Sequence, residues 1–187
     1  MVRAAGPITR LGAVVALAAG LLAALVLSGC DTNPEDTLSV NEGEPMKLGD
    51  LVYNVQITRF LNPRDGEDKA YLAGQPPPPK NEFYLGVFMQ IKNESGSSQD
   101  VPSDFRVLDT QGTEFKPIPS HSLFALDLGG KVTPNSELPE PETTAANGPI
   151  QGAMVLFLID RAANEDRPLV LHIPSSAGAT GRVTLDL

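Results

Sequence analysis

Apolar and polar residues alternate along much of the chain after residue 46, and this period of two predicts strands. In residues 51–58 one series of alternate positions is apolar and the other is mostly polar, as in a strand with one buried face. The apolar series is Leu51, Tyr53, Val55 and Ile57. Residues 83–91 keep the same period with both series largely apolar, which predicts a central strand covered on both faces.

Shorter apolar segments between Gly, Pro and Asn predict the remaining strands. These are residues 105–108, 113–115, 154–159, 169–173 and 182–187. Turn residues at 109–112 are expected to join two of them in a hairpin, and residues 178–181 to link the last two. Only residues 122–128 favour a short helical turn. Many short strands and 17 prolines indicate an all-β protein, a β-sandwich.

The central strand is expected to form one side of the core. Its inward series is Phe83, Leu85, Val87, Met89 and Ile91. A second sheet about 10 Å away must face it. The residues expected to lie opposite are Phe105, Val107 and Phe157.

The first 29 residues have the pattern of a secretory signal. Arg3 and Arg10 precede an apolar run over residues 11–27, and no acidic residue occurs before Asp31. A transmembrane helix is the alternative, but a span needs about 20 apolar residues and this run is shorter. We therefore expect residues 1–29 to be removed.

The run ends in Leu27-Ser28-Gly29-Cys30, which resembles the lipobox of bacterial lipoproteins. The resemblance implies cleavage between Gly29 and Cys30 and a diacylglyceryl group, with acyl chains such as palmitate, on the Cys30 thiol. Two acyl chains give stable attachment to a membrane. The expected location is the outer face of the bacterial cytoplasmic membrane, with the lipid on Cys30 as the anchor.

Three segments follow from these patterns. Residues 1–29 form the signal peptide, residues 30–45 the lipidated cysteine and a flexible polar tether, and residues 46–187 the sandwich domain. A domain of this size can bury a core without a metal or disulfide. We expect it to fold alone as a monomer.

Charge and cysteine content narrow the classes of partner. The chain has 23 acidic and 14 basic residues and a net charge of −9, and loss of Arg3 and Arg10 makes the mature protein more acidic. A protein that binds nucleic acid needs a basic surface, so we expect no nucleic-acid partner. Cys30 is the one cysteine of the chain, so no internal disulfide can form.

Candidate catalytic residues are few. Ser120-His121-Ser122 is the place where a nucleophile adjoins a possible base, which makes a cell-envelope hydrolase the catalytic alternative. No Gly-x-Ser-x-Gly motif is present, and a polar loop is the simpler interpretation. His121 and His172 have no zinc-ligand spacing. We therefore expect no catalytic residues, no cofactor and no enzyme activity.

Two long loops, residues 62–80 and 131–149, interrupt the strands, and loops of this length are often functional. The first has oxygen-bearing side chains that suit calcium but lack the spacing of an EF-hand loop, so a solvated acidic loop is the competing interpretation. These residues are Asn62, Asp65, Glu67 and Asp68.

The same loop contains four consecutive prolines, which favour a polyproline II segment. Such a segment is either a stiff spacer or an interaction loop that binds a partner. The prolines are Pro76, Pro77, Pro78 and Pro79, and Phe60, Tyr71 and Tyr84 are candidates to pack on them.

Four motifs resemble, in order, the signatures of a family of domains of unknown function on bacterial lipoproteins. They are LGDLVYNV (48–55), YLGVFMQIKNE (84–94), DFRVLDTQG (104–112) and GPIQGAMVLF (148–157). The resemblance spans residues 46–187. It implies a telokin-like, immunoglobulin-like sandwich, similar to a small secreted immunoprotective antigen of actinobacteria. That family has no established catalytic residues, and the proline-rich insertion before Phe83 departs from its pattern.

Taken together, the sequence predicts a lipid-anchored binding module that acts through its loops on an unknown envelope protein or ligand. The alternatives are the hydrolase at Ser120 and His121, and a structural surface antigen without a specific ligand.

Overall fold

The computed structural model describes residues 37–175 and 178–187. The predicted signal peptide, with Gly29 and Cys30, lies outside the described residues. The strands are β1 (Leu38–Asn41), β2 (Met46–Leu48), β3 (Leu51–Leu61), β4 (Glu82–Asn93), β5 (Gln99–Asp100), β6 (Arg106–Leu108), β7 (Glu114–Phe115), β8 (Lys131–Val132), β9 (Glu137–Leu138), β10 (Ala153–Asp160), β11 (Val170–Pro174) and β12 (Thr180–Thr184). The short helices are η1 (Asp68–Ala70), α1 (Thr144–Asn147) and η2 (Arg161–Asn164).

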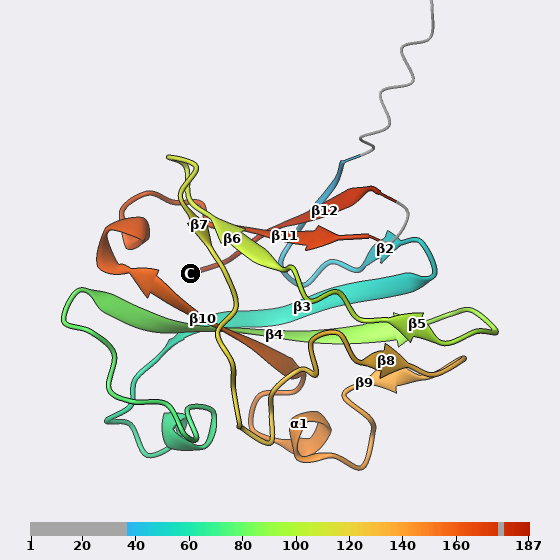
Figure 1. Cartoon of the computed structure of the whole chain (residues 1–187), viewed down its shortest axis with the longest axis horizontal. Coiled ribbons are helices and arrows are strands. Elements are labelled where there is room, and N and C mark those ends of the chain that lie inside the picture. Colours follow the sequence, from blue (N-terminus) through green and yellow to red (C-terminus); the bar gives the residue numbers. More distant parts are fainter. Residues whose placement is uncertain (1–36, 176–177) are drawn as a thin grey trace, which may run out of the picture. The chain divides into compact units, whose positions relative to one another are not determined.

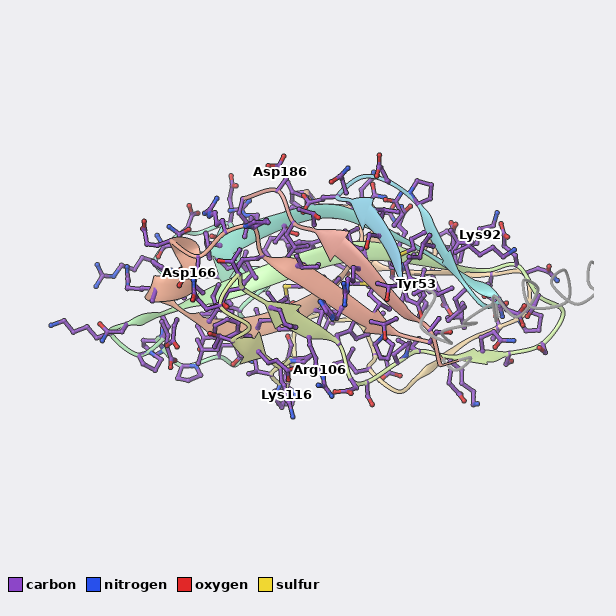
Figure 2. The ribbon with its side chains drawn as sticks, turned by 90° about the horizontal axis from the view of Figure 1, so that it is seen from above. Tyr53, Lys92, Arg106, Lys116, Asp166 and Asp186 are labelled. Atoms are coloured by element: carbon purple, nitrogen blue, oxygen red, sulfur yellow. The ribbon has the colours of Figure 1, made fainter. Side chains whose placement is uncertain are left out.

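Two sheets face each other and confirm the predicted β-sandwich (Figure 1). One sheet has the order β1-β12-β11-β6-β7, and the other has the order β10-β4-β3-β2 with β9 added to β4. A small third sheet pairs β5 with β8. In Figure 1, β11 and β12 lie above β3, β4 and β10, and in Figure 2, which is seen from above, β11 and β12 overlie that sheet.

The central position of β4 is confirmed. It pairs antiparallel with β3 on one side and with β10 on the other. Leu85, Val87 and Met89 are fully buried between the sheets, where Phe105 and Val107 meet them from the opposite side. The prediction for Phe157 was wrong, because Phe157 lies on β10 directly beside Leu85 in the same sheet.

The two faces of β3 exchange partway along the strand. The register with β4 shifts between Val55 and Ile57, and this β-bulge places one extra residue in β3. As a result Thr58 is buried and Ile57 is 40% exposed, so the predicted inward position of Ile57 was wrong. Beyond the bulge, Phe60 packs against the main core and Leu61 belongs to the other face.

A second apolar cluster covers the outer face of β4, as its two apolar series predicted. Tyr84 and Phe88 of β4 meet Tyr71 from the loop after β3, with the Tyr71 and Phe88 rings edge to face at 5.1 Å. Tyr71 also lies 4.5 Å from the ring of Phe124. The long loops therefore form a third layer, seen below β4 in Figure 1, and are part of the folded core.

The predicted flexible tether ends earlier than residue 45. Strand β1 pairs in parallel with β12, and the described part of the predicted tether, residues 37–45, belongs to the same compact unit as the sandwich. The Glu42 carboxylate accepts hydrogen bonds from the backbone N–H of Thr58, at 2.9 Å, and from that of Asp186, at 3.2 Å. The sequence concealed this because the segment is held mainly by backbone pairing and one carboxylate, while only Val40 of β1 packs against the main core.

Two other local expectations were also wrong. Residues 122–128 form a turn and then run beside β10, where Leu126 N–H donates to Met154 O and Met154 N–H donates to Phe124 O. This backbone pairing covers an otherwise open strand edge and replaces the expected helical turn. Gly181, which was expected in the link between the last two strands, lies inside β12. Glycine is needed there because a side chain would collide with Met46 and Leu48.

A candidate binding pocket

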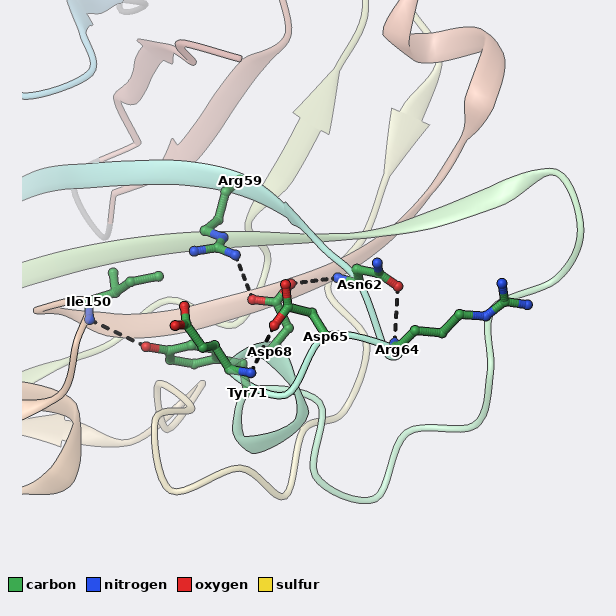
Figure 3. A network of polar contacts seen from close by, with 8 residues as sticks. Arg59, Asn62, Arg64, Asp65, Asp68, Tyr71 and Ile150 are labelled. Atoms are coloured by element: carbon green, nitrogen blue, oxygen red, sulfur yellow. Dashed lines mark hydrogen bonds and ion pairs between the residues drawn. The ribbon is translucent and has the colours of Figure 1, made fainter.

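The loop after β3 is held by one buried carboxylate. Asp68 accepts a hydrogen bond from Nη2 of Arg59 at 2.6 Å and another from the backbone N–H of Asn62 at 2.7 Å (Figure 3). Because Asp68 is almost fully buried, this ion pair fixes the start of the loop against β3. Asn62 in turn accepts from the Arg64 N–H, and the Arg64 side chain extends away from the network (Figure 3).

The proline segment is held at both ends. The Tyr84 hydroxyl donates to the Pro76 carbonyl at 2.7 Å, and the Glu82 N–H donates to the Pro79 carbonyl at 3.1 Å. Nε2 of Gln75, just before the prolines, donates to the Pro119 carbonyl at 2.6 Å. Proline rings restrict the backbone further, so the segment is a stiff wall beside β4.

This wall encloses a pocket of about 680 Å³ together with residues from the end of β3, the start of β4 and η2. The lining residues are Phe60, Leu61, Asn62, Pro63, Arg64, Pro77, Pro78, Pro79, Lys80, Glu82, Phe83 and Arg161. The volume lies in the range of about 300–1,000 Å³ that is usual for small-molecule sites. We call this site the proline-walled pocket.

Two aromatic rings and one guanidinium are stacked in this pocket. The Phe60 and Phe83 rings lie 5.3 Å apart, and the Arg161 guanidinium carbon lies 3.8 Å from the Phe83 ring centroid. Nε of Arg161 also donates to the Lys80 carbonyl at 3.0 Å. The stacking and this hydrogen bond fix the plane of the guanidinium.

The charge of the pocket opposes that of the whole protein. Arg64, Lys80 and Arg161 line it, and within the described residues none of them has an ion-pair partner. Glu82 is the lining carboxylate, and one of its oxygens is buried without a hydrogen-bond partner. Burial, and then the nearby Glu82, raise the pKa of Tyr84, so its hydroxyl remains a donor to Pro76.

Two of the predicted aromatic neighbours are near the prolines. Phe60 shares the pocket with them and Tyr84 holds Pro76, whereas Tyr71 lies in the second cluster. Sequence reasoning missed Arg64, Lys80 and Arg161 as site residues. The one sequence signal for Arg64 and Lys80 was a basic residue directly after a proline in an acidic chain. Arg161 has no such signal, because only the fold brings it to residue 80.

The predicted Ser120-His121 region does not assemble into a triad in the part of the chain that the structure describes. The buried Ser122 hydroxyl donates to the Ala70 carbonyl at 2.8 Å and accepts from the Phe124 N–H, so it serves the loop structure. Ser120 lines a separate hollow of about 320 Å³, whose lining does not include His121.

The oxygens considered for calcium hold the loop together. Both Asp68 oxygens and the Asn62 oxygen accept the hydrogen bonds described above, and Asp65 accepts from the Glu67 N–H at 2.9 Å. Within residues 37–175 and 178–187, no group of three or more His, Cys, Asp or Glu residues could hold a metal ion.

The second long loop encloses a different hollow. Its volume is about 690 Å³, and its charged lining residues are Lys92, Glu137, Glu140 and Glu142. Three carboxylates here contrast with the three cations of the proline-walled pocket.

Among the described residues, no helix is long and apolar enough to cross a membrane.

No protein-family model matches the chain, and no curated protein does either. Similar solved structures include an uncharacterized β-sandwich protein from Clostridium difficile 630, with 13% identity and a TM-score of 0.51 over 81% of this chain and 96% of that chain. The yjhA protein from Bacillus subtilis is 12% identical, with a TM-score of 0.48 over 80% of this chain and 100% of its own. The secreted protein MPT63 from Mycobacterium tuberculosis is 9% identical, with a TM-score of 0.47 over 79% and 97%.

The likeness to the Clostridium protein shows the fold alone, an all-β sandwich. The resemblance of the four motifs to a lipoprotein family stays a prediction from sequence.

Proposed function

We propose that this protein is a lipid-anchored binding module on the outer face of a bacterial cytoplasmic membrane, and that the proline-walled pocket is its binding site. The pocket carries the proposal because three cations that have no ion-pair partner among the described residues, two aromatic rings and a fixed proline wall converge there. The anchor rests on the lipobox-like Leu27-Ser28-Gly29-Cys30. The module acts as a monomer and without catalysis.

Within the loop of residues 62–80, the proposal assigns binding to the prolines and a structural role to the rest of the loop. Residues 62–80 contribute Tyr71 and Leu72 to the second cluster, so the loop as a whole is structural. The part left for a partner is the surface of Pro77, Pro78 and Pro79 that lines the pocket. A rigid surface loses little conformational entropy on binding, which favours affinity.

The test uses a variant that fills the pocket. Pro77 lines the pocket and is exposed, whereas its exposed neighbour Pro76 does not line it. The full mature protein is incubated with an extract of bacterial envelopes and examined by native mass spectrometry. A saturable ligand adduct is expected for the wild type and the Pro76→Trp control, and its loss for Pro77→Trp. The same adduct on Pro77→Trp, or none on the wild type, contradicts the proposal.

A further inference from the structure

We infer that the ligand of the proline-walled pocket is a small amphiphilic anion, with a carboxylate or phosphate group on an apolar body. This inference rests on the proposed function, because it names the ligand class of the same pocket. Three groups of observations carry it: the fixed guanidinium of Arg161, the surplus of cations, and the apolar wall.

Arg161 is prepared to receive an oxyanion. Its guanidinium is stacked 3.8 Å from the Phe83 ring centroid, and its Nε is used by the Lys80 carbonyl. Its two Nη groups have no hydrogen-bond or ion-pair partner within the described residues. A guanidinium held in one plane with its terminal nitrogens free binds a carboxylate or phosphate through two parallel hydrogen bonds.

The other cations add to this preference. Arg64 and Lys80 line the same pocket, also without ion pairs in the described part of the chain. Carboxylates are abundant in this protein, and Asp65 and Glu67 lie in the same loop, yet neither lines the pocket. Three cations against Glu82 leave a positive site in a protein of net charge −9, which attracts an anion.

The apolar lining of the pocket favours a ligand whose anionic group is attached to an apolar body. Pro77, Pro78 and Pro79 form one wall, and Phe60 and Phe83 lie beside them. Inorganic phosphate would leave this surface in contact with water. A pocket of about 680 Å³ accommodates a ring or short chain attached to the anionic group, and burial of that body adds a hydrophobic contribution.

The experiment is calorimetric titration of the full mature protein, in an uncharged detergent at low salt, with three probes. Phenyl phosphate carries both features, inorganic phosphate only the charge, and benzyl alcohol only the ring. Phenyl phosphate is expected to bind once per chain and about tenfold or more tighter than either partial probe. Dihexanoyl phosphatidate is a further probe: tighter binding than phenyl phosphate identifies a lipid headgroup as the source, and weaker binding a soluble anion.

Variants place the interaction at Arg161. Arg161→Gln is expected to weaken phenyl phosphate binding about tenfold or more, and Arg161→Lys to retain an intermediate affinity because it keeps the charge without the fork. Arg182→Gln loses the same charge away from the pocket and is the matched control. Equal thermal midpoints show that the variants are folded.

Three outcomes overturn the inference. Benzyl alcohol binding as tightly as phenyl phosphate at the pocket would show an apolar site, which leaves the proposed function standing. Phenyl phosphate binding that is unchanged in Arg161→Gln would place the anion elsewhere. No binding of any probe would exclude this ligand class, and the Pro77→Trp experiment would then judge the proposed function separately.

Discussion

Arg59 and Asp68, nine residues apart in the sequence, form an ion pair at 2.6 Å in which the Asp68 side chain is 2% exposed and that of Arg59 is 36% exposed. The pair joins β3 to the loop that contributes Tyr71 and Leu72 to the second apolar cluster and also contains the proline wall. Asp68 therefore holds the loop that forms one wall of the candidate binding pocket against strand β3 of the sandwich.

Asp68→Ala is expected to destabilise the protein by about 2–3 kcal/mol, since Arg59 and the Asn62 N–H lose their acceptor in a mostly buried setting. Urea unfolding followed by circular dichroism measures the change. Asp65→Ala, at an exposed position in the same loop, should cost less than about 1 kcal/mol. Equal losses in the two variants would show that the buried pair does not hold the loop.

Glu42→Ala tests whether the segment predicted as a tether belongs to the fold. The variant removes the carboxylate that accepts from Thr58 of β3 and from Asp186 after β12, so we expect a loss of about 1–3 kcal/mol. Among the residues that the structure describes, Glu44 accepts only from the nearby Asn41, and Glu44→Ala is the matched control with a smaller loss. An unfolding midpoint of Glu42→Ala equal to that of the wild type would mean that the tether reaches residue 45 after all.

His172 makes stability depend on pH. Burial and the facing Arg182 lower the pKa of His172, Arg106 lowers it further, and Glu114 opposes them. The unfolded chain then binds a proton at a higher pH than the folded one does. Stability is therefore expected to fall as the pH drops below about 6.5, the usual pKa of histidine.

Two measurements check this dependence. Urea unfolding at pH 8 and pH 5.5 should give a smaller difference for His172→Gln than for the wild type. In an NMR titration, Arg182→Gln should raise the pKa of His172, while Arg161→Gln should not. A pH dependence that survives unchanged in His172→Gln would assign it to other groups.

Cys30→Ala tests the anchor. The variant lacks the thiol that receives lipid, so precursor of full length is expected to accumulate and no acylated form to appear. Intact-mass spectrometry of the membrane-extracted protein distinguishes the two forms. An unmodified thiol at Cys30 in the wild-type protein would exclude lipid anchoring.

The sequence predicted the parts of the fold that depend on a local period. Strand β4 was identified, with both covered faces, because its two apolar series are continuous. The bulge in β3 was not, because an extra residue changes which face is buried without changing composition. Strand β1 was missed since its four residues are mostly exposed and are held by backbone pairing with a strand at the far end of the chain.

In the candidate site too, the features that are local in the sequence were predicted and those that depend on distant pairing were not. The prolines were identified as a feature because they are consecutive in the sequence. Arg161 could not be, because it reaches them only through the antiparallel pairing of β10 with β4, which places Asp160 opposite Glu82. A site that combines a loop with a distant strand end has no single sequence motif.

The most direct test of the account is photo-crosslinking in living cells from residue 77. A benzophenone amino acid replaces Pro77 in the pocket or, as the control, Pro76 outside it, and the products are weighed by mass spectrometry. A ligand adduct of defined mass is predicted from position 77 in the membrane fraction, absent from position 76 and reduced by Arg161→Gln. No adduct at position 77, or equal adducts at both positions, would contradict the claim that this pocket binds a ligand.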